Sequence, residues 1–223
     1  MAKEKRTMKE WVKRYAFCLL GLFISALGVA FTRGADLGVS QVASVANVLS
    51  FKFDFMTMGN WLICWNCFLI FLQILILRRK FRISQLFLQV AFSFLFGYFT
   101  DFGVWLFAPI CPESYVLKIL VVIAGVAMVA FGIAFNVIAE AVMNCGEAFV
   151  QAIVDTIHKN FGHTKIVFDV ACVATSVILS LIFFNGELIG VREGTVIAAV
   201  VTGFMINFFV KIMRPGLTKF IKK

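Results

Sequence analysis

Six long apolar stretches constrain the fold of this chain more than any other feature of its sequence. A helix that crosses the hydrocarbon core of a bilayer needs about 20 mainly apolar residues. The stretches of that length are 14–33, 59–77, 85–107, 117–138, 166–184 and 195–212. With 61% hydrophobic residues, the chain has more apolar surface than one soluble core of 223 residues can bury. The sequence therefore predicts an all-α integral membrane protein of about six transmembrane helices in a lipid bilayer.

The distribution of lysine and arginine predicts the orientation of these helices. Basic residues cluster before residue 15, at 78–82 and after residue 210. With six spans, the three clusters share one side of the membrane, and basic loops stay on the cytoplasmic side. We therefore expect a multi-pass protein of the bacterial inner membrane, with cytoplasmic basic ends at 1–13 and 213–223. This topology accounts for the net charge of +9, and we expect no nucleic-acid partner.

Two further segments have helical character but do not qualify as crossings. Residues 39–51 are apolar and too short to span a bilayer. Residues 143–158 carry Glu147, Gln151 and Asp155 on one helical face, at i, i+4 and i+8. Each segment is expected either to dip into the membrane and return, or to lie on its surface as an amphipathic helix.

The chain also contains an internal repeat. A shift of 104 residues aligns one half with the other, and a two-residue insertion between Asp36 and Ala46 changes the shift to 106. The aligned pairs include Gly21 with Gly125, Gly28 with Gly132, Asp36 with Glu140, Gly97 with Gly203 and Phe102 with Phe208. Chance similarity between two apolar sequences is the alternative, but the shared order of elements favours a repeat. Segments 14–112 and 113–212 then hold three spans and one short helix each, and an odd number of crossings puts the two repeats in opposite orientations.

Inverted repeats commonly place a substrate site near the midplane, where re-entrant helices from the two halves meet. Asp101 is the most conspicuous polar residue in a predicted span, where an ionised carboxylate costs about 3 kcal/mol or more. It is either a proton carrier or substrate ligand, or a structural carboxylate with hydrogen-bonding partners. Its repeat partner is Asn207, which is also polar.

Several polar residues lie at the starts of the two short segments. A helix N-terminus attracts anions, but Ser40 and Asn144 are also good N-cap residues, and Glu147 would complete a capping box with Asn144. Asn136 lies inside a predicted span, where hydrogen bonding between helices is the alternative to a ligand role. The residues expected to line a substrate or proton site are Asp101, Asn207, Asp36, Glu140, Ser40, Asn144, Glu147 and Asn136.

No pattern in the sequence predicts catalysis, a metal site or a cofactor. Cys64 and Cys67 have the spacing of a metal pair, but they lie in a predicted span without a second pair, which favours packing. Phosphate loops, Ser/His/Asp signatures and zincin motifs are all missing from the sequence. We therefore do not expect an enzyme.

Two stretches carry a family resemblance, GADLGVSQVASVANVLS and GELIGVREGTVIAAVVTGFMINFF. Together with the Gly-rich first span, they resemble the YczE/YyaS/YitT family of small bacterial membrane proteins over nearly the whole chain. The resemblance implies a bacterial inner-membrane protein related to transport. It implies no substrate.

These features favour a small-solute transporter or exporter that works by alternating access. In its proton-coupled form, Asp101 and either Glu147 or Glu140 carry the proton. One alternative is a substrate-binding membrane subunit that depends on a separate energising partner, and another is a membrane-embedded enzyme or assembly factor. The substrate is an unknown small molecule, and a second copy of the chain as a homodimer is a further expected partner.

Overall fold

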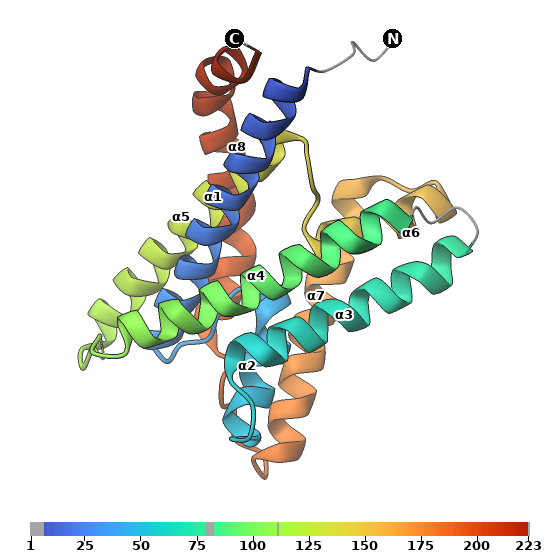
Figure 1. Ribbon diagram of the computed structural model, residues 1–223. Helices are drawn as coiled ribbons and strands as arrows, with labels where there is room; N and C mark the ends of the chain where they lie inside the picture. Colours follow the sequence, from blue (N-terminus) through green and yellow to red (C-terminus); the bar gives the residue numbers. More distant parts are fainter. Residues whose placement is uncertain (1–6, 79–82, 111, 223) are drawn as a thin grey trace.

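The computed structural model describes residues 7–78, 83–110 and 112–222 (Figure 1). Over these residues the protein is helical apart from loops, turns and one isolated bridge between Gly38 and Val191. The helices are α1 (Met8–Gly34), α2 (Gln41–Lys52), α3 (Met58–Leu77), α4 (Ile83–Phe107), α5 (Tyr115–Ala139), α6 (Cys145–Ile157), α7 (Phe161–Phe183) and α8 (Glu193–Lys222). Several members of the predicted basic clusters, Lys3, Lys5, Arg6, Arg79, Lys80, Arg82 and Lys223, lie outside the described residues.

The six predicted spans are confirmed as helices, since six helices of the described chain are long and apolar enough to cross a membrane. The largest difference is at the C-terminus, where the expected tail continues α8 through Pro215. The last turns of α8 pack on α1, where the Phe220 ring contacts Phe17 edge-on and Lys13 Nζ donates to Phe220 O at 3.1 Å. These contacts with α1 accompany the extension of the last helix. A hydropathy profile does not include contacts between helices, so it could not predict the extension.

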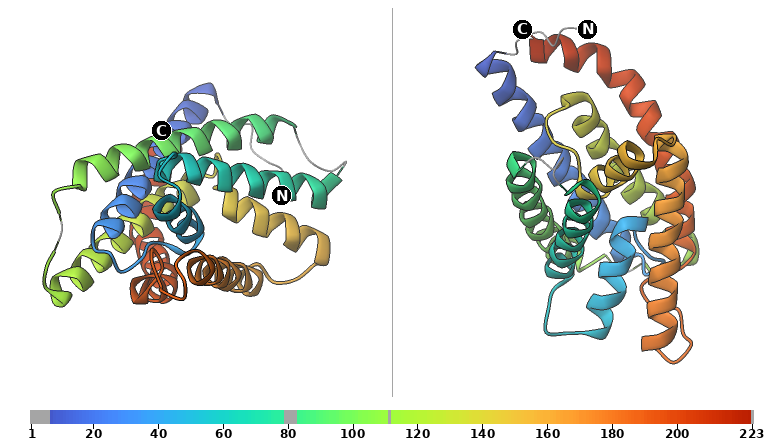
Figure 2. Two further views of the ribbon diagram at one scale, coloured as in Figure 1. Left: turned by 90° about the horizontal axis from the view of Figure 1, so that it is seen from below. Right: turned by 90° about the vertical axis from the view of Figure 1, so that its right-hand side faces the viewer.

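The two short helices begin inside the protein and run outwards in different directions. The start of α1 and the end of α8 lie at one end of the molecule, which we call the terminal side (Figures 1 and 2). Helix α2 runs from the interior towards the opposite, far side, whereas α6 runs mainly sideways, away from α1 (Figure 1). Their first residues, Gln41 and Cys145, are both buried. Both helices therefore start in the buried interior, as re-entrant helices do, rather than lying wholly on the surface.

The inverted repeat is visible in the crossing of α1 and α5. A Cβ atom added to Gly21 would lie 2.5 Å from Gly132 O, and one added to Gly28 would lie 2.7 Å from Gly125 O. The repeat aligns Gly21 with Gly125 and Gly28 with Gly132. Exchanging the two repeats therefore turns the first contact into the second, so a pseudo-twofold axis relates them. Small residues let two membrane helices approach this closely.

The backbone just after these helices repeats as well. Asp36 and Glu140, which the alignment pairs, both have positive φ angles, 54° and 48°. This left-handed turn ends each long helix and sends the chain back into the protein towards its re-entrant helix. The repeat therefore extends from sequence to local conformation.

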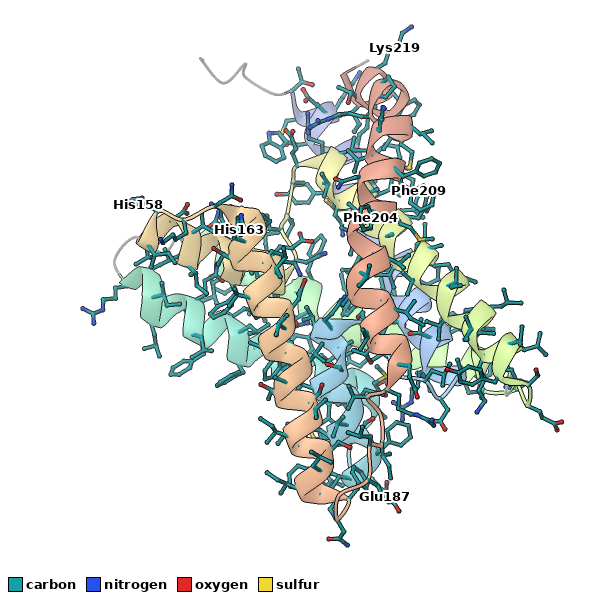
Figure 3. All side chains as sticks on the ribbon, turned by 180° about the vertical axis from the view of Figure 1, so that it is seen from behind. His158, His163, Glu187, Phe204, Phe209 and Lys219 are labelled. Atoms are coloured by element: carbon teal, nitrogen blue, oxygen red, sulfur yellow. The ribbon has the colours of Figure 1, made fainter. Side chains whose placement is uncertain are left out.

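The helices form two groups, and each group contains two of the four repeat-related pairs of helices. One group is α1, α4, α5 and α8, and the other is α2, α3, α6 and α7. The groups are joined unequally, because α3 lies along α4 whereas α7 has little contact with α8. A Cβ atom on Gly97 of α4 would lie 2.6 Å from Gly59 O of α3, but one on its repeat partner Gly203 would meet open space. Figure 3 shows α7 and α8 diverging from the loop at Glu187.

Alanine substitutions at Gly28 and Gly203 test this arrangement. Gly28→Ala forces α1 and α5 apart, and overpacking of this kind costs about 1–3 kcal/mol. Gly203→Ala adds a methyl group in open space on a helix, where alanine is favoured over glycine by about 1 kcal/mol. We expect the melting temperature of the purified protein to fall for Gly28→Ala and to stay level or rise for Gly203→Ala. Equal losses in the two variants would contradict the described crossing.

Candidate functional site

The first turns of the two re-entrant helices meet inside the protein. A Cβ atom added to Gly146 of α6 would lie 3.5 Å from the side chain of Val42 of α2. These residues are repeat partners under the 104-residue shift, so their contact lies at the pseudo-twofold axis. The first turns of helices carry backbone N–H groups without intrahelical partners, so this arrangement brings polarity into a membrane protein's interior.

The predicted capping bonds at these helix starts are not formed. Ser40 and Asn144 hold the N-cap positions, but neither side chain accepts a hydrogen bond from its helix. Asn144 Oδ1 instead accepts from Nδ2 of Asn136 on α5, at 3.3 Å. Asn136 is buried, and its Oδ1 atom has no hydrogen-bonding partner. The structure therefore brings Asn136 and Asn144 together, as a site would require, and leaves one acceptor free.

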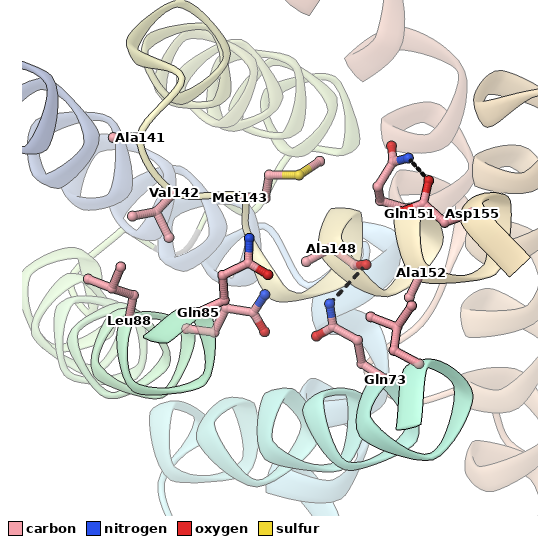
Figure 4. A pocket seen from close by; sticks show the side chains of 12 residues that line it. Gln73, Gln85, Leu88, Ala141, Val142, Met143, Ala148, Gln151, Ala152 and Asp155 are labelled. Carbon is pink, nitrogen blue, oxygen red and sulfur yellow. Dashed lines mark hydrogen bonds between the residues drawn. The ribbon is translucent and has the colours of Figure 1, made fainter. Parts of the chain in front are cut away.

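A partly polar cavity of about 190 Å³ lies beside α6 (Figure 4). Its walls are the last turns of α3, the first turns of α4, the 141–143 loop and one flank of α6. Its polar lining consists of four glutamines and one carboxylate, Gln73, Gln85, Gln89, Gln151 and Asp155. A single water needs only about 15 Å³ of such space, so the cavity has room for a small solute.

Two of these glutamines are buried with free acceptor atoms. Gln73 and Gln89 are only 4% and 5% exposed, and Oε1 of each lacks a hydrogen-bonding partner. Gln73 Nε2 donates to Ala148 O at 3.2 Å, which fixes the orientation of this amide with Oε1 away from that carbonyl. A buried acceptor without a partner costs about 1–3 kcal/mol. Both acceptor atoms are thus covered by protein atoms, although their residues form part of the cavity wall.

The other polar lining residues lie closer to the surface. Gln85 and Asp155 are exposed, and Gln151 Nε2 donates to Asp155 Oδ1 at 2.7 Å. Of the polar face predicted at 143–158, Gln151 and Asp155 thus border the cavity, and Asp155 lies in the last turn of α6.

A charged cluster connects α6 to α7. Lys165 and Asp169 form an ion pair within α7, and Glu147 of α6 interacts electrostatically with both. Burial raises the pKa of Glu147 above its usual value, Lys165 opposes this rise, and Asp169 adds to it. Glu147 is therefore easier to protonate than an ordinary glutamate, as a proton-carrying group requires.

Asp101 has a structural setting on the far side. Its Oδ2 accepts from Thr57 Oγ1 at 2.6 Å, and its Oδ1 accepts from the backbone N–H of Gly59 at 2.7 Å. Because Thr57 is the N-cap of α3, the carboxylate binds the positive end of that helix. Asp101 therefore fastens α4 to the start of α3, and it lies away from the cavity, which adjoins the other end of α3.

The remaining predicted residues are spread over the surface. Asp36 and Asn207 are exposed, the first in the loop after α1 and the second on α8. Glu140 is exposed at the terminal side and interacts with Arg14 at 3.8 Å and Arg214 at 4.0 Å. None of these three lines the cavity among the residues that the structure describes.

The buried glutamines were missed in the sequence, although a signal was present. Gln73 and Gln89 fall inside the apolar stretches 59–77 and 85–107, where a polar side chain is unusual. Charged residues cost more than amides in a membrane and therefore dominated the sequence-based prediction. A count of all polar residues within the predicted spans would have identified both glutamines.

Alanine substitutions at the repeat-related positions 101 and 207 test the structural setting of Asp101. Asp101→Ala removes the acceptor of two hydrogen bonds and leaves the first turn of α3 without its partner, at a cost of about 1–3 kcal/mol. Asn207→Ala changes an exposed side chain and serves as the control. Thermal unfolding should show a lower melting temperature for Asp101→Ala alone. An unchanged melting temperature in both variants would contradict the role of Asp101 in fastening α4 to α3.

A pH titration of stability tests the environment of Glu147. Because its folded-state pKa lies above 4.5, ionising this carboxyl group is harder in the folded protein than in the unfolded chain. The free energy of unfolding should therefore fall as the pH rises from 4.5 through the raised pKa, and Glu147→Gln should remove this part of the fall. Melting temperatures across this pH range are the measurement, with Glu187→Gln at an exposed loop position as the control. Parallel curves for wild type and Glu147→Gln would contradict the buried setting.

Comparison with known proteins places the chain in a family. A family model described as "Family of unknown function (DUF6198)" matches residues 12–211. No curated protein and no solved structure matches the chain. The match does not confirm the YczE/YyaS/YitT resemblance. Because it covers most of the sequence, the chain belongs to the DUF6198 family of unknown function.

Proposed function

We propose that this protein is a small-solute transporter of the bacterial inner membrane, with both ends in the cytoplasm, that works by alternating access. One observation carries the proposal. The two helix groups, each of which is pseudo-symmetric within itself, are docked through α3 and α4 but hardly through α7 and α8, and a cavity lies beside this junction at α6. The positive-inside distribution of lysine and arginine supports the orientation. The YczE/YyaS/YitT resemblance, kept here as a proposed distant relationship, points to transport as well.

The pseudo-symmetry supplies a second state. When two inverted repeats differ in conformation, each repeat can adopt the conformation of the other. This exchange closes the substrate site on one side of the membrane and opens it on the other. In the present state α3 is docked on α4, and α7 stands off α8. The exchanged state docks α7 on the open face of α8 at Gly203 and frees α3 from α4. Lys165 is the repeat partner of Gly59. Because lysine is larger than glycine, the distance between docked α7 and α8 is greater than that between docked α3 and α4.

In this proposal Glu147, rather than Asp101, couples transport to protons. Both carboxylate oxygens of Asp101 are engaged by α3, whereas burial already raises the pKa of Glu147. Glu147 also precedes Ala148, whose carbonyl oxygen binds Gln73 in the cavity wall. Protonation of Glu147 removes the charge that interacts with Lys165 and Asp169 of α7 and so changes the contact between α6 and α7.

Distances between spin labels test alternating access without knowledge of the substrate. Two repeat-related exposed pairs report on the two dockings, Cys64 with Phe102→Cys for α3 and α4, and Val170→Cys with Phe208→Cys for α7 and α8. Each pair is measured in proteoliposomes at acidic and alkaline pH, with the other native cysteines replaced. We expect two distance populations in each pair, with the α3–α4 distance long when the α7–α8 distance is short. Leu19→Cys with Val137→Cys, on α1 and α5, is the control and should keep one distance.

A single pH-independent distance in both test pairs would overturn the proposal. Solute binding by such a static protein would instead favour the substrate-binding subunit of a multi-component transporter.

A further inference from the structure

The last turns of α8 have no counterpart in the first repeat. Helix α4 ends at Phe107, and the 106-residue shift pairs Phe107 with Met213. Helix α8 continues beyond this point, through Pro215, to Lys222. We call residues 211–222 the α8 tail, which contains four basic residues and no acidic one. The plan of the two repeats therefore does not account for the chain beyond Met213.

The α8 tail packs on α1 through apolar residues and leaves its basic residues exposed. Ile221 is only 2% exposed, and the Phe220 ring contacts Phe17 of α1 edge-on. At 3.6 residues per turn, Lys211, Arg214 and Lys219 lie on one half of the helix. All three are exposed. The α8 tail thus presents a basic surface to its surroundings.

The charged residues around the α8 tail carry an excess of positive charge. At the described ends of α1, α5 and α8, the basic residues are Lys9, Lys13, Arg14, Lys211, Arg214 and Lys219, and the acidic residues are Glu10 and Glu140. Glu10 Oε1 accepts from Arg14 Nε at 3.0 Å and from Arg14 Nη2 at 2.9 Å. Glu140 interacts with Arg14 at 3.8 Å and with Arg214 at 4.0 Å, the latter between two exposed side chains, where an ion pair is weak. The two carboxylates therefore do not balance the basic surface.

Aromatic residues of α1 place the α8 tail at the level of the lipid head groups. The rings of Trp11 and Tyr15 stack with their centroids 5.8 Å apart. Tryptophan and tyrosine are enriched where a membrane protein crosses the head-group region. Lys13, which lies between them in the chain, donates to Phe220 O at 3.1 Å. In the right-hand view of Figure 2, the last turns of α8 cross the end of the molecule towards the start of α1, so the tail reaches this level at a slant.

We propose that the α8 tail binds the head groups of anionic phospholipids through Lys211, Arg214 and Lys219. Lysine and arginine form charge-assisted hydrogen bonds with phosphate oxygens, and basic segments beside a membrane span attract anionic lipids. A zwitterionic lipid carries a cationic group next to its phosphate, so it gains less from this surface. The bound lipid holds the α8 tail, and with it the contact between α8 and α1, at the membrane surface. This inference goes beyond the proposed function and does not depend on transport.

Short-chain lipids with identical acyl chains test the head-group preference of the purified full-length protein. Dihexanoyl-phosphatidylglycerol is anionic, and dihexanoyl-phosphatidylcholine is zwitterionic. Glycerol 3-phosphate and inorganic phosphate supply the phosphate group without the lipid. Each probe is titrated in a neutral detergent at constant ionic strength, and the saturable shift of the melting temperature gives its affinity, because a ligand of the native state stabilises it. We expect the phosphatidylglycerol to bind about tenfold more tightly than the phosphatidylcholine or either free phosphate.

Two triple variants with the same change in net charge locate the binding. The first combines Lys211→Gln, Arg214→Gln and Lys219→Gln, and it should weaken the phosphatidylglycerol about tenfold, to the level of the phosphatidylcholine. The control combines Lys118→Gln, Lys159→Gln and Arg192→Gln, which lie outside the α8 tail, and it should keep the wild-type preference. If the first triple variant fails to fold, its three single substitutions, each expected to weaken the phosphatidylglycerol about twofold, decide the matter.

The possible outcomes separate lipid binding from other roles of the basic residues. Equal affinities of the two lipids, or equal effects of the two triple variants, would overturn the inference and leave these residues with a role in membrane orientation alone. Binding of glycerol 3-phosphate or inorganic phosphate as tightly as the phosphatidylglycerol would also overturn it, because the surface would then recognise a soluble anion. A single static state in the spin-label experiment would overturn the proposed transport mechanism and leave the lipid site in place.

Discussion

The close crossing of α1 and α5 is the contact on which the rest of this structure depends. Lipid is as apolar as the helix surfaces, so membrane helices associate through close packing rather than through the hydrophobic effect. Glycines at 21, 28, 125 and 132 let the two backbones meet, and they do so reciprocally about a pseudo-twofold axis. This axis relates the two turns at Asp36 and Glu140 that direct the chain back into the protein. The positions of both re-entrant helices follow from it.

Re-entrant helices bring backbone and side-chain polarity to a depth where water is absent. Polar groups there must find partners within the protein or line a cavity. The structure satisfies many of them internally, as in the bonds from Asn136 to Asn144 and from Gln73 to Ala148. The acceptors that lack partners at Gln73 and Gln89 coincide with the cavity beside α6. Other buried polar atoms without partners, such as Oδ1 of Asn47 and of Asn136, lie outside the cavity lining.

The two repeats share a plan but differ in a few contacts between the helix groups. In the first repeat, Gly59 and Gly97 permit close docking of α3 on α4, and Asp101 fastens the start of α3. In the second repeat, Lys165 and Asn207 stand in place of Gly59 and Asp101, and α7 remains apart from α8. Sequence divergence at these positions therefore breaks the symmetry of the fold. The proposed transport cycle uses this asymmetry.

The sequence by itself determined the membrane class, the six spans, the two short helices and the inverted repeat. These properties are local or periodic, since the length of an apolar run and the order of elements do not depend on tertiary contacts. Only the tertiary structure decided which polar residues meet. The carboxylate of Asp101 binds residues more than forty positions away in the chain, and the cavity combines glutamines from α3, α4 and α6. Helix packing decides which side chains face a neighbouring helix and which face lipid, and hydropathy carries no information on that choice.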